Sequence, residues 1–269
     1  MSIITISRGS YSRGKEVAEK VAKVMNYECI SRDILLEASE QFHIPEIKLV
    51  RAIHDAPRVL DRFSHGKQKY VAFIRAAILK HMKKDNIVYH GLAGHFFLQD
   101  ISHVLKVRVI ADLEERVKEE MRREGITAEE ARNLIRKDND ERRKWGMALY
   151  GQDTWDSGLY DLVVHIKTKS VDDAVSLVLH AAQFECFKTT PESQKRIDNM
   201  ALAAEVKAAL ANRFAYAETS AEDGHVHVKI DAPPIQEEPV SKEVKEITKK
   251  IEGVRDLTVH VIPFPLMKD

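Results

Sequence analysis

Short runs of apolar, β-branched residues alternate along the chain with longer stretches in which apolar positions recur every three or four residues. Helical spacing is clearest after the first run and in two charged segments, 114–124 and 128–144. Buried strands separated by helices are typical of a parallel sheet covered by helices on both faces. The pattern therefore predicts an α/β fold with strands at residues 3–6, 27–30, 87–90, 105–111 and 162–166. Residues 44–84 read as wholly helical, an insertion that we expect to cover a cleft.

The pattern changes near Cys186. Residues 186–197 are polar and include a proline, so we expect a linker between a first domain at 1–185 and a second at 198–269. The second begins with a helical pattern at 201–212, and an Ala-Glu-Asp-Gly turn between two strand patterns indicates a hairpin. A further helix and a last strand follow, which predicts a small α+β domain in the order α-β-β-α-β.

The composition bears on the kinds of partner and the cellular compartment that we expect for the protein. The 42 basic and 42 acidic residues give no overall field that would attract nucleic acid or an anionic membrane. Cys29 and Cys186 are far apart in sequence and favour a reduced cytoplasm over a disulfide-bonded fold. The first residues, MSIITIS, lack the basic flank of a signal peptide, and no apolar run approaches the roughly 20 residues that span a bilayer. We expect a soluble cytoplasmic protein.

The stretch RGSYSRGKEVAEKV, at residues 8–21, carries the first candidate chemistry. Gly9 and Gly14 lie five positions apart between a predicted strand and a predicted helix, which is the context of a phosphate-binding loop. Backbone N–H groups of residues 12–14 and the charge of Lys15 would face phosphate oxygens. Glu16 stands where such loops carry a magnesium-binding hydroxyl. A tight turn with a solvated lysine is the alternative.

A second group of candidate functional residues lies in the segment IRKDNDERRKW. Arg136, Asp140 and Arg143 are spaced i, i+4 and i+7, which places them on one helix face. Two guanidinium groups around a carboxylate would suit a phosphorylated sugar, because the arginines bind phosphate oxygens and the aspartate accepts from hydroxyls. An exposed helix with ordinary charge pairing is the alternative that spacing alone leaves open.

These features, in this order, resemble the cytidylate kinase-like branch of the P-loop nucleoside monophosphate kinases, over the chain to about Gln183. The resemblance rests on ITISR and the loop after it, LEERVKEEMRREG, the Arg136/Asp140/Arg143 spacing, and W-D-x-x-x-Y-D-L-V at 155–163. It implies a P-loop NTPase-type sheet with a helical lid and ATP-dependent phosphoryl transfer to a nucleoside monophosphate, CMP or dCMP first, with ATP and Mg²⁺ as cofactors. In that branch the loop often ends in Gly, a basic residue and Glu, which makes Glu16 a subfamily trait.

The resemblance also implies roles for individual residues. Those expected to act in catalysis are Lys15, Arg136 and Arg143. Those expected to bind ATP are Gly9, Ser12, Arg13, Gly14, Lys15, Glu16 and Arg116. Those expected to bind the acceptor are Arg32, Asp33, Arg136, Asp140 and Arg143.

Two positions depart from that branch. Leu92 stands where an arginine is expected after the third strand, and His165 stands where an asparagine follows the last strand. Leu92, together with Glu16, favours a second function, a nucleotide-binding regulator with weak or no kinase activity that signals through its C-terminal domain.

The C-terminal segment resembles a BON domain, in ALAAEVKAAL, DGHVHV and IEGVRDLTVHV. The resemblance implies a binding or oligomerisation role, with a protein, a small ligand or a second copy of the chain as partner. His225 and His227 alternate with Val226 and Val228, so we expect the histidines to face solvent. No histidine spacing suggests a metal site, and magnesium is expected only with the nucleotide.

Overall fold

The computed structural model describes residues 2–9, 12–31, 40–42, 66–91 and 94–263. Its larger unit is a five-stranded sheet in the order β2-β3-β1-β4-β5, and all four strand pairs are parallel. The strands are β1 (Ile3–Arg8), β2 (Glu28–Ile30), β3 (Ile87–His90), β4 (Val104–Ala111) and β5 (Leu162–Ile166). The predicted α/β fold is confirmed, with strand positions that agree to within two residues.

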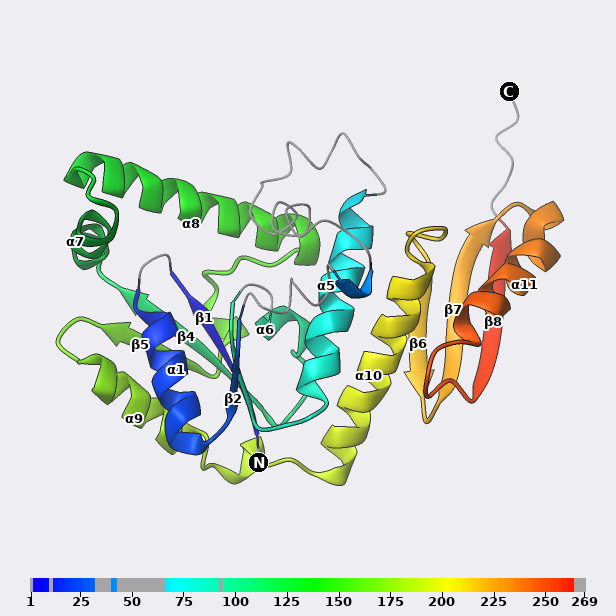
Figure 1. Cartoon of the computed structure of the whole chain (residues 1–269), viewed down its shortest axis with the longest axis horizontal. Helices are drawn as coiled ribbons and strands as arrows, with labels where there is room; N and C mark the ends of the chain where they lie inside the picture. Colours follow the sequence, from blue (N-terminus) through cyan, green and yellow to red (C-terminus); the bar gives the residue numbers. More distant parts are fainter. Residues whose placement is uncertain (1, 10–11, 32–39, 43–65, 92–93, 264–269) are drawn as a thin grey trace.

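The central strand β1 is buried on both faces over Ile3–Ile6, as expected from its β-branched residues. Ile3 and Ile4 point to opposite sides of the sheet and belong to different cores. The core around Ile4 is closed by α1 (Gly14–Met25) and α9 (Val171–Ala181). The core around Ile3 is closed by α5 (Gly66–Met82), α6 (Gly94–Phe97) and α10 (Pro191–Leu210) (Figure 1). Helix α5 is the described part of the predicted helical insertion, and residues 43–65 lie outside the described residues.

Two helices lie beyond the carboxyl ends of the strands, where the resemblance places a lid (Figure 1). They are α7 (Leu113–Glu124) and α8 (Ala128–Tyr150), joined through Gly125 in the left-handed region and a capping box between Thr127 and Glu130. Their shared apolar contact is small, with Val117 facing Ala131 and Ile135. Helix α8 runs six residues beyond the predicted end at 144, because residues 145–150 are mostly helix-compatible and Gly151 ends it.

Helix α10 begins inside the predicted linker. Thr190 caps it through the backbone N–H of Ser193, and Pro191 occupies its first turn, so a stretch that reads as polar is ordered helix. Ile197 is completely buried against the core that includes α5. Residues 191–197 of the expected linker are therefore the first turns of α10, and the division of the chain into domains at 185 and 198 stays a prediction.

The same helix also belongs to a second core. Its face with Ala201, Ala204 and Ala208 packs in the core with α5, whereas Val206 and Leu210 lie beneath the C-terminal sheet. Helix α10 therefore joins the two units through side chains on two of its faces.

The C-terminal unit has the predicted order of elements. Its three-stranded sheet has the order β6-β7-β8, with β6 and β7 antiparallel and β7 and β8 parallel. The elements are β6 (Glu218–Glu222), β7 (His225–Ala232), α11 (Glu237–Thr248) and β8 (Asp256–Pro263). The hairpin turn is tighter than predicted, because Asp223 and Gly224 both adopt positive φ and allow a two-residue connection.

The faces of β7 follow its alternation. Val226, Val228 and Ile230 are buried, while His225 and His227 are exposed, which confirms the predicted orientation. Within the described residues, no group of metal-ligating side chains could hold an ion, and no helix has both the length and the apolar character needed to cross a bilayer.

The sharing of α10 predicts cooperative unfolding of the two units. Ile197→Ala should destabilise the protein by about 2–5 kcal/mol, and Val206→Ala by at least about 1.5 kcal/mol. Both should lower the midpoint of one calorimetric transition. Arg196→Ala, at an exposed neighbouring position, is the control and should change stability by no more than about 0.5 kcal/mol. Two transitions, each shifted by only one substitution, would mean that the units unfold independently.

Candidate functional site

The Gly-rich loop is anchored to β4. The Gly9 N–H donates to the Val109 carbonyl oxygen (3.2 Å), and the buried Ser12 hydroxyl lies 2.9 Å from the same oxygen and 3.0 Å from that of Gly9. The Ser12 N–H donates to the Gly9 carbonyl (3.3 Å), so this group is engaged within the loop. The first turn of α1 then offers N–H groups that have no acceptor inside the helix. Together with the helix dipole they suit an anion.

Glycine is required at position 14 by close packing. A Cβ atom at Gly14 would lie 2.8 Å from the Cβ atom of Arg8, closer than real Cβ contacts allow. Arg13, just before it, adopts φ 61°, which completes the sharp turn from strand to helix. The loop therefore has the strand–turn–helix geometry that the sequence predicted, with residues 10–11 outside the described residues.

Lys15 and Glu16 lie on the outer side of the loop. The Lys15 side chain is exposed, and its Nζ atom is 3.6 Å from Glu19. The Glu16 carboxylate accepts hydrogen bonds from Arg13 (2.7 Å) and lies 3.4 Å from Lys20. These pairs are at the surface, so little free energy opposes their exchange for a ligand.

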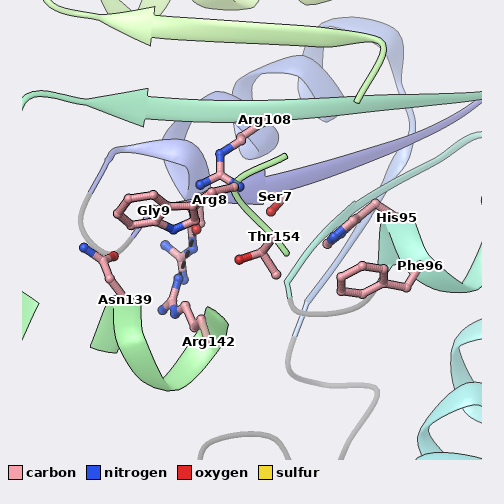
Figure 2. Close-up of a pocket in the computed structure, with 10 residues that line it drawn as sticks. Ser7, Arg8, Gly9, His95, Phe96, Arg108, Asn139, Arg142 and Thr154 are labelled. Atoms are coloured by element: carbon pink, nitrogen blue, oxygen red, sulfur yellow. Dashed lines mark hydrogen bonds between the residues drawn. The ribbon is translucent and has the colours of Figure 1, made fainter. Parts of the chain in front are cut away.

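A small cavity lies beside the loop, between the sheet and α8. Figure 2 shows Arg108 extending from β4 on one side, and Asn139 and Arg142 extending from α8 on the other, around Arg8 and Gly9. The remaining lining residues are Ser7, His95, Phe96, Thr154 and Trp155. The cavity measures about 30 Å³, which is room for about two water molecules.

Guanidinium groups converge at this cavity. Arg108 donates to the Tyr160 hydroxyl (3.1 Å), Arg142 to the Arg8 carbonyl (3.0 Å), and Arg116 to the Asn139 side-chain oxygen (3.0 Å). Each of these acceptors is neutral. Burial lowers the pKa of Arg116, the positive charges of Arg142 and Arg108 lower it further, and the negative charge of Asp138 acts in the opposite direction. Cations that repel one another in a partly buried site favour a bound anion.

One of these guanidinium groups lies beside Gly9 of the loop. A Cβ atom at Gly9 would lie 3.6 Å from the Cζ atom of Arg116, so the guanidinium lies directly against this glycine. Arg116 was expected near ATP, and the structure brings it to the loop.

Tyr160, Thr154 and His95 form a network of uncharged hydrogen-bonding groups at the cavity. The Tyr160 hydroxyl donates to the Thr154 carbonyl oxygen (3.0 Å) and lies 3.4 Å from Nε2 of His95. Burial lowers the pKa of His95 to about 3, and the charges of Arg108 and Lys106 act in the same direction. His95 is therefore neutral at physiological pH and adds no charge to the anion site.

The predicted residues of α8 lie beside the cavity rather than in it. Arg136 and Asp140 are exposed. Arg143 binds Asp153, with Nη2 2.6 Å from Oδ2, and its guanidinium lies 5.5 Å from the centre of the Trp155 ring. Arg32 and Asp33 lie outside the described residues, so their expected role stays a prediction.

Sequence reasoning missed Asn139 and Arg142, which are the α8 residues that line the cavity. A signal for them existed. Ala131 and Ile135 mark the buried face of α8, and the same face continues at helical spacing to Asn139 and Arg142. Arg108 was missed because a charged residue in a strand carries no spacing motif that marks it as functional.

Comparison with known proteins finds a family that matches the sequence and a solved structure that shares the fold. Residues 3–168 match the model of the Cytidylate kinase-like family. The "Cytidylate kinase" of Thermococcus kodakarensis is 31% identical over 96 residues, 36% of this chain, and that of Methanopyrus kandleri is 31% identical over 110 residues, 41% of this chain. Each match covers 49% of the relative, so the chain spans about half the length of these curated relatives.

A solved structure supports the fold. The crystal structure of an uncharacterized protein from Eubacterium ventriosum superposes with a TM-score of 0.54 at 22% identity, over 68% of this chain and 98% of that one. At this identity the likeness concerns architecture alone. The family match ends before α10 and the C-terminal unit.

The buried, neutral His95 predicts a dependence of stability on pH. Its folded-state pKa of about 3 lies below the usual 6.5, so the unfolded state binds the extra proton between these values. Stability from this residue is complete above about pH 6.5 and is lost as the pH falls toward 3. Urea unfolding of wild type and His95→Asn across this range should show a shallower pH slope in the variant. Equal slopes would contradict the assignment.

Proposed function

The chain belongs to the cytidylate kinase-like family, and we propose that it catalyses ATP-dependent phosphoryl transfer to a nucleoside monophosphate, with CMP or dCMP as acceptor. The family and the relatives named cytidylate kinase support a nucleotide kinase. The observation that carries the proposal further is the convergence of Arg108, Arg116 and Arg142 beside Gly9, next to a phosphate-binding loop.

The loop offers anion-binding groups on two sides. The start of α1, with Lys15, suits the phosphates of ATP. Residues 7–9 line the cavity under α8, where the arginines would hold the phosphate of the acceptor. Two anions held on either side of one short loop could be aligned for direct transfer.

The transfer itself needs little chemistry from the protein. A nucleoside monophosphate already presents an ionised oxygen as nucleophile, so no general base is needed, and catalysis consists of alignment and charge neutralisation. Lys15 would hold the outer phosphates of ATP, and Arg142 and Arg108 would balance the charge that spreads over the transferring group. Arg136, Asp140 and Arg143 remain candidates for contacts that form when α8 adjusts to the acceptor.

Magnesium would arrive with ATP. It commonly keeps several waters and takes one or two carboxylates plus substrate phosphates, and Glu16 is the carboxylate that the loop supplies. The fit requires that Glu16 exchange its contacts with Arg13 and Lys20, which are exposed ion pairs. When bound, the ion would neutralise charge on the phosphates.

Access to the cavity requires movement of α8. A space of about 30 Å³ is far below the roughly 300 Å³ or more of a small-molecule site. The contacts that close it are polar: Arg142 with the Arg8 carbonyl, Arg116 with Asn139, and Arg143 with Asp153. Such contacts can reform with phosphate oxygens, and closure over bound nucleotide would exclude water.

A regulator that binds nucleotide without efficient transfer is the second candidate. Glu16 favours it, because this carboxylate is paired with two cations at the position where a magnesium-binding hydroxyl usually lies. The C-terminal unit would then be the output, through a bound protein or small ligand. A coupled assay of phosphate transfer to CMP, dCMP, UMP, AMP and GMP separates the two functions. ATP binding without transfer to any of the five supports the regulator.

Lys15→Ala should weaken ATP binding at least tenfold, because a charge-assisted hydrogen bond is worth roughly 1.5–3 kcal/mol. Isothermal calorimetry measures the affinity, and thermal melting checks the fold. Lys23→Ala is the matched control on the same helix, since Lys23 is an exposed residue of its last turn. Equal ATP affinity in wild type and Lys15→Ala would contradict the phosphate-loop assignment.

Replacing α8 arginines one at a time tests which face of the helix contacts the acceptor. Arg142→Ala should raise the acceptor KM or lower kcat at least tenfold while ATP affinity changes little, since Arg142 lines the cavity. The exposed Arg136 provides the comparison on the same helix, and Arg136→Ala should cost less. A larger loss for Arg136→Ala or Arg143→Ala than for Arg142→Ala would instead support the face predicted from the sequence.

A further inference from the structure

We propose that Trp155 is a stacking platform for the nucleobase of the acceptor, so that the site distinguishes nucleotides from simple phosphate esters. The inference rests on the proposed function, because it names a contact of the same acceptor. Trp155 lies in the segment between α8 and β5 and lines the cavity with Arg142 and Asn139.

The exposure of this side chain singles it out. Trp155 is 56% exposed, although tryptophan contributes most to stability when its large apolar surface is buried. The other described aromatic rings that line the cavity are buried against further rings: Phe96 stacks on Tyr150 with 4.4 Å between ring centres, and His95 lies 4.0 Å from Phe96 in a tilted arrangement. Trp155 is therefore the lining aromatic residue with ring surface available to a ligand.

The Trp155 ring is held in place by neighbouring residues. The Arg143 guanidinium lies 5.5 Å from its centre, and Arg143 is bound in turn by Asp153 (2.6 Å). Asp153 also accepts a hydrogen bond from the backbone N–H of Trp155 (3.0 Å). A platform fixed in this way loses little conformational freedom when a base stacks on it.

The position of Trp155 relative to the arginines suits contact with the nucleobase of the ligand. If the phosphate lies among Arg8, Arg108 and Arg142, the ribose and base must extend away from that cluster toward the rim of the cavity, where Trp155 is exposed. Every nucleobase has a π face, so stacking tolerates different bases. Trp155 should therefore favour any nucleoside monophosphate over ribose 5-phosphate, and leave the choice among bases to other residues.

Binding measurements on the full chain test this proposal. Trp155→Ala should weaken CMP binding by about 5- to 150-fold and leave ribose 5-phosphate binding unchanged in calorimetry. Trp155→Phe should restore most of the CMP affinity. Phe184→Ala, at an exposed aromatic residue near the end of α9, is the control and should bind CMP as wild type does.

Fluorescence gives a second readout. The chain has two tryptophans, so Trp145→Phe leaves Trp155 as the single emitter. CMP should change its emission, and ribose 5-phosphate should not. If Trp145→Phe does not fold, the calorimetric comparison with the tryptophan pair intact decides alone.

The outcomes separate the two proposals. CMP affinity that is equal in wild type and Trp155→Ala overturns the stacking role and leaves the kinase proposal standing. Equal weakening of CMP and ribose 5-phosphate would mean that Trp155 only positions Arg143 and Asp153, which also overturns stacking. A wild type that binds none of the five monophosphates overturns both proposals.

Discussion

Gly14 packs against Arg8 so closely that a single added carbon atom would lie 2.8 Å from the Arg8 side chain. This contact sets where α1 starts relative to the end of β1, and with it the separation between the two sides of the loop. Because β1 is buried between β3 and β4, its carboxyl end is fixed by the two cores of the sheet. The apolar packing of β1, several residues away, therefore holds the backbone of the candidate anion site in place.

The cavity brings positive charges close together, which lowers the stability of the protein while no anion is bound. Arg116 is partly desolvated and feels Arg142 and Arg108, and such groups destabilise a protein until an anion joins them. A neutral His95 and the Tyr160 network limit that cost, since they hydrogen-bond without adding charge. Stability given up at a binding site in this way is recovered when the ligand binds.

Much of this could be predicted from the sequence, for physical reasons. Strands such as β1 and β4 are rich in β-branched and other apolar residues, and the loop between β1 and α1 has two glycines at the spacing of a tight strand-to-helix turn. Helix α10 was harder, because Pro191 and the polar residues around it suggest a linker, whereas they form a capped first turn. On α8 the conspicuous charges are the exposed ones, and the buried stripe that leads to Asn139 and Arg142 has to be followed from Ala131. Trp155 was part of a motif, but its exposure is a tertiary property that no spacing reveals.

The helix shared by the two cores has a thermodynamic consequence. Side chains of α10 pack beside α5 on one side and beneath the C-terminal sheet on the other. A ligand that binds the C-terminal unit and changes the packing of α10 would therefore alter the free energy of the nucleotide-binding unit. Linkage makes such an effect reciprocal, so nucleotide would change the affinity for that ligand by the same factor. A single helix that contributes to both cores would be enough to couple the two units in this way.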